Sequence, residues 1–167
     1  MSSFKNATLA KIKAAWVDEL GEDLEEDIWD SALLRVNDSS SCARLSIIQF
    51  KILHRIHCSK ARLAEIYPNT DASCDRCRNT PADLTHMFWS CSALTSYWFA
   101  IFKTLSEALD MDLQPCAVMA IFGTTDGRYC TIRKRSLLLT LLARRRILLH
   151  WKSKNPASVS LWFNDLM

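Results

Sequence analysis

Cys74-Asp75-Arg76-Cys77 and, nine residues after it, His86-Met87-Phe88-Trp89-Ser90-Cys91 are the two stretches that decide how this chain folds. Cysteines separated by two residues in a turn aim both sulfurs at one ion, and a histidine with a third cysteine completes a tetrahedron. The spacing Cys74-x2-Cys77-x8-His86-x4-Cys91 therefore predicts a Cys3His zinc site. Four protein ligands leave no open position for water, so the predicted zinc ion is structural and not catalytic.

The two halves of this site belong to different kinds of local structure. Residues 68–81 form the richest turn region of the chain, whereas the residues after them have apolar side chains at helical spacing. Five residues along a continuous helix would turn His86 and Cys91 about 140° apart, too divergent to share an ion. We therefore expect the helix to break near Cys91 and a new one to begin near Ser92, with the zinc site contained in residues 68–92.

The cysteine count favours metal over disulfides. Seven cysteines are many for 167 residues, and their number is odd. The N-terminus carries Lys5, Lys11 and Lys13 and has no continuous apolar segment of the kind found in secretion signals. We expect an intracellular protein, nuclear or cytoplasmic, in which clustered cysteines bind metal. A redox role for Cys74 and Cys77 is not favoured, because no βαβ pattern surrounds them.

Composition and apolar periodicity predict the fold class. Hydrophobic residues make up 49% of the chain, enough for a core, and the presence of only 3 glycines disfavours many short strands joined by tight turns. The prediction is an all-α fold, a compact multi-helix domain with one zinc-stapled Cys-x-x-Cys turn. We divide it into an acidic helical N-terminal arm over 1–40 and a helical zinc-binding domain over 41–167. Helical spacing is found within residues 8–20, 28–34, 42–57, 60–67, 84–109, 131–152 and 158–167.

Charge is distributed unevenly along the chain, although the net charge is only +3. Residues 1–40 carry 4 basic and 9 acidic side chains, whereas residues 121–167 carry 9 basic and 2 acidic ones. In the helix expected over 42–57, Arg44, Lys51 and Arg55 fall within about 40° of one another, and the rest of the circumference is mostly apolar. This pattern predicts a buried helix with one exposed basic stripe.

A second basic block lies near the C-terminus. Arg144-Arg145-Arg146 spans about 200° of a helix, so the three side chains cannot share one face opposite the leucines. Arginine stems packed along the leucines would resolve this conflict. Blocks of basic residues favour binding to a polyanion such as a nucleic acid. Lys152 extends the C-terminal block. Ordinary solvated helix faces are the alternative interpretation of both blocks.

The sequence lacks the patterns of the common catalytic sites. It has no Gly-rich phosphate loop, no Gly-x-Ser-x-Gly and no His-Glu-x-x-His. We therefore predict that the protein is not an enzyme and has no small-molecule substrate. No segment is apolar enough to span a membrane. The six tryptophans each lie in an apolar phase and are predicted to anchor the core rather than stack on bases, at positions 16, 29, 89, 98, 151 and 162.

Several phrases of the chain resemble one known family. They are Ile48-Gln49-Phe50-Lys51-Ile52-Leu53-His54-Arg55, Arg62-Leu63, both halves of the cysteine and histidine pattern, Tyr97-Trp98, Ala143-Arg144-Arg145 and Trp151-Lys152. Together they are similar to the C-terminal zinc-binding region of LINE-type (non-long-terminal-repeat) retrotransposon reverse transcriptases, over most of the chain from about Trp16 onward. One departure is Ser92, where relatives commonly carry proline.

The resemblance implies a non-catalytic module that engages RNA or DNA beside the polymerase. The zinc ion would stabilise the fold that presents the basic residues. The residues that would contact phosphates are Arg44, Lys51, Arg55, Arg144, Arg145, Arg146 and Lys152. The alternative is a protein-interaction domain, or an inert genomic remnant with a purely structural zinc.

Overall fold

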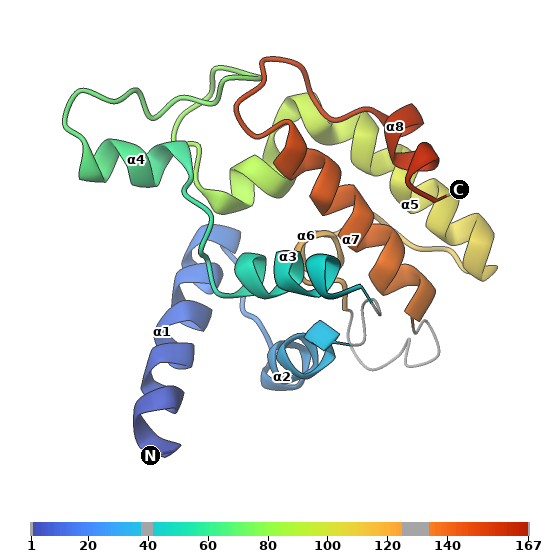
Figure 1. Cartoon of the computed structure of the whole chain (residues 1–167), viewed down its shortest axis with the longest axis horizontal. Helices are drawn as coiled ribbons and strands as arrows, with labels where there is room; N and C mark the ends of the chain where they lie inside the picture. The colour runs from blue at the N-terminus through green and yellow to red at the C-terminus, as the bar shows by residue number, and fades with distance from the viewer. Residues whose placement is uncertain (1, 38–41, 125–133, 167) are drawn as a thin grey trace.

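The computed structural model describes residues 2–37, 42–124 and 134–166, and all regular structure within these ranges is helical (Figure 1). The all-α prediction is confirmed. None of the described helices is both long and apolar enough to cross a bilayer. The α-helices are α1 (Ser2–Leu20), α2 (Glu26–Leu34), α3 (Ala43–Leu53), α4 (Lys60–Ile66), α5 (Thr95–Leu109), α6 (Ala117–Phe122), α7 (Lys134–Leu149) and α8 (Val159–Asn164).

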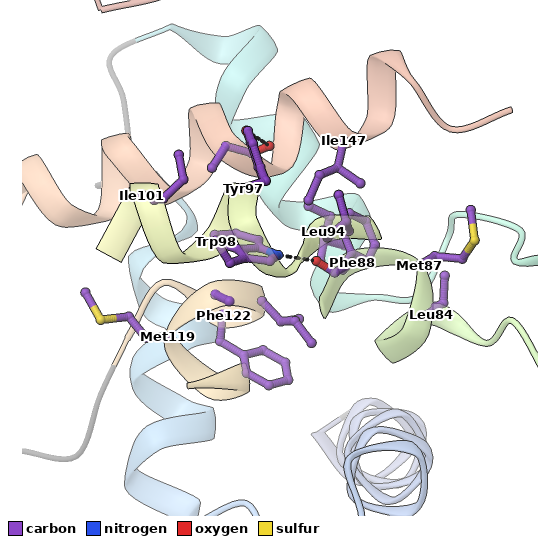
Figure 2. Packing of buried hydrophobic residues seen from close by; sticks show 14 of the residues in the cluster. Leu84, Met87, Phe88, Leu94, Tyr97, Trp98, Ile101, Met119, Phe122 and Ile147 are labelled. Atoms are coloured by element: carbon purple, nitrogen blue, oxygen red, sulfur yellow. Dashed lines mark hydrogen bonds between the residues drawn. The ribbon is translucent and has the colours of Figure 1, made fainter. Parts of the chain in front are cut away.

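Helices α5 and α7 pack side by side (Figure 1). The buried face of α5 carries Tyr97 and Trp98, and the Tyr97 hydroxyl donates a 3.0 Å hydrogen bond to the Ala143 carbonyl of α7. Figure 2 shows the Trp98 indole directed at the Phe88 carbonyl, to which its Nε1 donates at 2.7 Å. These bonds satisfy the polar tips of two large buried rings, so the rings contribute their full apolar area to the core.

The first two helices contribute to the same core as the rest of the chain. Trp16 of α1 is buried, and its Nε1 donates to the Leu53 carbonyl at 3.1 Å. The Trp16 ring meets the edge of Phe122 from α6 at a centroid distance of 5.3 Å. Trp29 of α2 lies 6.2 Å from the same phenyl ring. The boundary at residue 40 stays a prediction, and the structure shows that side chains on both sides of it are packed together.

Helix ends follow local chemistry. The helix α1 ends before Gly21, which takes a left-handed φ of +71°. The Ser59 side chain accepts from the Arg62 amide and caps α4. Gly123 ends α6 at φ +73°, and a Cβ atom there would lie 3.1 Å from both an Arg144 nitrogen and a Leu137 methyl carbon. Glycine at 123 therefore permits both the turn and the close packing of α7.

Helix α3 differs from its prediction in two ways. It ends at Leu53 rather than near residue 57, because the chain turns at Arg55, which takes φ +53°. Its apolar side chains are also not all buried, since Ile47 is 53% and Phe50 43% exposed. The exposed face of α3 is thus wider and more apolar than the predicted narrow basic stripe. Residues 131–133 of the last long predicted helix lie outside the described residues.

Candidate metal centre

The structure brings Cys74, Cys77, His86 and Cys91 together. Their ligand atoms all lie within 4.8 Å of one another. The sulfurs of Cys74 and Cys91 are 3.8 Å apart, and the Cys77 sulfur is 3.3 Å from His86 Nε2. A tetrahedral site with metal–sulfur bonds of about 2.3 Å has sulfur–sulfur edges of about 3.8 Å. The four side chains can therefore hold a metal ion, and the structure describes no disulfide among them.

The first two ligands lie on a tight turn. The Arg78 amide donates to the Cys74 carbonyl, and the Cys74 amide donates to the Asn79 carbonyl, both at 2.9 Å. Arg78 takes a left-handed φ of +66°, which reverses the chain after Cys77. This turn directs backbone N–H groups of Arg76 and Cys77 at the Cys74 sulfur. Such donors stabilise a thiolate, the form of cysteine that binds metal.

The last two ligands are brought together by an irregular helix. Residues His86–Ser90 form a π-helical turn, closed by the Cys91 amide donating to the His86 carbonyl at 3.2 Å. Cys91 itself is extended, with φ −63° and ψ +123°, and a short 3₁₀ turn begins at Ser92. The predicted break and restart are confirmed. The wider π turn reduces the rotation that would separate the two side chains on an α-helix.

Electrostatics within the cluster favour a cation. Burial opposes ionisation of Cys74, but donors from Cys77, Arg76 and His86 outweigh it and lower the pKa of this thiol to about 6. Burial, with the nearby sulfurs of Cys77 and Cys74, raises the pKa of the Cys91 thiol to about 12. The two pKa values shift in opposite directions because the thiols interact: the first thiolate forms easily, and its negative charge opposes ionisation of the next thiol. A divalent cation would compensate that repulsion.

Charged side chains that the sequence did not single out connect the site to its surroundings. Arg76 donates to the Met87 carbonyl at 2.6 Å and so joins the cysteine turn to the π turn. Lys60 of α4 pairs with Asp75 at 3.1 Å, and the Asp83 carboxylate accepts from the His86 amide at 2.7 Å. Asp83 could have been identified from the sequence, because it lies just before a helical segment, where aspartate commonly caps a helix.

Three of the seven residues predicted to contact nucleic acid are exposed. Arg44 and Lys51 lie one heptad apart on α3, and Lys152 follows the end of α7.

Arg55 is used inside the molecule. Its guanidinium forms an ion pair with Glu19 of α1 and lies 4.6 Å from the centroid of the Trp16 ring. The second oxygen of Glu19 accepts from the Thr85 amide at 3.1 Å, next to the metal ligands. Arg55 therefore links α1 to the turn after α3. The prediction that it extends the exposed stripe of Arg44 and Lys51 is wrong.

The arginine triplet is divided between surface and core. Arg145 and Arg146 both pair with Asp165 after α8, the former at 3.0 Å. Arg144 is 0% exposed and donates to the Ala120 carbonyl of α6 at 2.7 Å. A side chain in that position cannot reach a phosphate. The prediction that Arg144 contacts nucleic acid is therefore wrong, and Arg144 is a core residue. Packing of arginine stems among leucines, which the sequence suggested, accounts for it.

No model of a known protein family matches the chain.

Proposed function

We propose that this protein is a non-catalytic nucleic-acid-binding module, derived from the C-terminus of a retrotransposon reverse transcriptase and held together by one structural zinc ion. The donor set supports the choice of metal, because three thiolates and one imidazole in a tetrahedral arrangement suit zinc. The resemblance described above supports the origin. The surface of α3 is the observation that carries the nucleic-acid function.

That surface combines cations with one exposed aromatic ring, Phe50, which is 43% exposed. Arg44 and Lys51 lie on one face of α3, and the Phe50 ring of the same helix contacts the half-buried His54 ring at a centroid distance of 4.1 Å. Lysine and arginine attract phosphates regardless of sequence, and aromatic rings offer faces on which bases stack. A ring exposed on a helix that also carries cations is the combination used by surfaces that bind single-stranded nucleic acid.

The surface continues toward Lys152. Burial, and after it the charge of nearby Lys51, lowers the pKa of His57. Lys51 is close enough to His57 to affect its pKa, and His57 lines one cleft with Lys152. We propose that the exposed cations Arg44, Lys51 and Lys152 form one footprint for a polyanion.

The expected effect of neutralising α3 is a weaker and less salt-dependent affinity. The double variant Arg44→Gln/Lys51→Gln should bind short RNA and DNA about tenfold more weakly at low salt, with a slope of log affinity against log salt that is shallower by about 1 to 2. Fluorescence anisotropy over a salt series measures both quantities. The matched control is Lys11→Gln/Lys103→Gln, which removes the same charge from exposed lysines on α1 and α5.

Equal losses in the two double variants would leave only a general charge effect and contradict an interface on α3. Absence of RNA and DNA binding by the native protein at low salt would remove the proposal altogether. If the native protein instead forms oligomers or captures a protein partner through Ile47 and Phe50, the exposed apolar part of α3 is a protein interface.

A further inference from the structure

A cleft of about 560 Å³ lies beside the metal centre and uses none of the four ligands. It is formed by the segment after α3, the start of α4, the cysteine turn and the chain after α7. Small-ligand sites typically have volumes of roughly 300–1,000 Å³, so the space is large enough for one planar ring system with its substituents. Its wall includes His57, Lys60, Asp75, Trp151 and Lys152.

The Trp151 ring is fixed in the wall of this cleft. Its Nε1 donates to the Cys58 carbonyl at 3.0 Å, and its ring contacts Phe88 at a centroid distance of 5.0 Å. His57 lies 5.9 Å from the same indole. Trp151 is only half-buried, so the prediction that it anchors the core holds for part of the side chain, and the rest is accessible. An aromatic ring that is already immobilised loses little conformational entropy when a flat ligand stacks on it.

The charges around the cleft suit a phosphate. Lys152 is exposed at its rim, and the one carboxylate in the wall, Asp75, is paired with Lys60 at 3.1 Å. The buried Nε2 atom of His57 makes no hydrogen bond with any described residue. That atom has almost no accessible surface, so what the wall offers a ligand is an aromatic platform and an available cation.

We propose that this cleft binds one unpaired nucleobase of the bound nucleic acid, with the base stacked against Trp151 and its phosphate at Lys152. The inference rests on the proposed function and adds to it a preference for single-stranded over double-stranded nucleic acid. Bases inside a duplex are already paired and stacked, so only single-stranded segments, loops or ends could place a base in the cleft. The cations of α3 would bind either form, and the cleft would favour single strands.

The test compares single-stranded RNA, a duplex of equal length and the same single strand with one abasic position. A fluorescent purine analogue in the strand reports stacking. The native protein should bind the single strand more tightly than the duplex and quench the analogue. Trp151→Leu should weaken single-strand binding about fivefold to a hundredfold, the range expected for one base–aromatic stack, and leave duplex binding unchanged.

Further variants separate binding from folding. Trp151→Phe should retain part of the affinity, and Lys152→Gln should weaken single-strand binding without affecting the fold, since this side chain is exposed. Lys154→Gln, an exposed lysine outside the cleft wall, is the matched control and should bind normally. Circular dichroism and metal content identify any variant that has lost its structure.

The outcomes distinguish this inference from the proposed function. If intact, abasic and duplex RNA bind equally and Trp151→Leu weakens none of them, the cleft proposal is overturned while nucleic-acid binding stands. If the native protein binds no nucleic acid, the proposed function fails. If a free nucleoside monophosphate saturates the cleft as tightly as the single strand does, the cleft is a free-nucleotide site, which also overturns the proposal.

Discussion

Removal of the metal is expected to unfold the region around residues 68–92 and to destabilise the whole domain. Cys74 and Cys91 are both completely buried, and their neighbours Phe88 and Leu94 belong to the central core. The zinc-binding free energy of small structural sites reaches about 10–16 kcal/mol at neutral pH, and much of it is folding free energy. Packing around this site is extensive, so a smaller loss is expected here, of about 3 kcal/mol or more.

Elemental analysis of the purified protein should find one zinc per chain, and denaturant unfolding with and without a strong chelator measures the stabilisation. Cys91→Ser should abolish stoichiometric zinc and give the same loss of stability as the chelator, because a hydroxyl oxygen is a poor zinc ligand. The control is Cys58→Ser, which changes an exposed cysteine that is not a ligand. A metal-free protein with unchanged stability would contradict both the site and its structural role.

The grouping of Cys74, Cys77, His86 and Cys91 could be predicted because it depends on few residues at short spacing. Cys74 and Cys77 lie on one turn, and the rotation between His86 and Cys91 required a break in the helix. The form of that break could not be predicted, since no local pattern identifies a π turn. The same limit applies to Arg76, whose partner is a carbonyl in a distant turn.

The exposure of the basic residues does not follow from the sequence, because charge alone does not determine exposure. Arg44 and Lys51 are exposed as predicted, on a helix whose period identifies one face. Arg55 and Arg144 are not available, because one pairs with Glu19 and the other enters the core. Both contacts join segments that are far apart in sequence, so periodicity within a single helix carries no information about them.

Replacement of Arg144 is expected to separate the effects of its volume and its charge. Its Nε and Nη2 atoms make no hydrogen bond with a described residue, and burial lowers the pKa of its guanidinium to about 9. The side chain is therefore still protonated at neutral pH, in a place where a charge is costly. Arg144→Ala would leave a cavity against α6 and should destabilise the protein by about 2–5 kcal/mol. Arg144→Met fills much of the same space without the charge.

The methionine variant should be as stable as the native protein or more stable, because replacing buried charged groups with apolar ones of similar volume is often neutral or stabilising by about 1–4 kcal/mol. Urea unfolding of both variants provides the comparison. Arg145→Met, one position along α7, should change stability by less than about 1 kcal/mol, since its ion pair with Asp165 is partly exposed. Equal losses for Arg144→Met and Arg144→Ala would mean that the guanidinium, through its bond to the Ala120 carbonyl, holds α6 against α7. RNA affinity should be unchanged in Arg144→Met, because a fully buried side chain makes no contact with a phosphate.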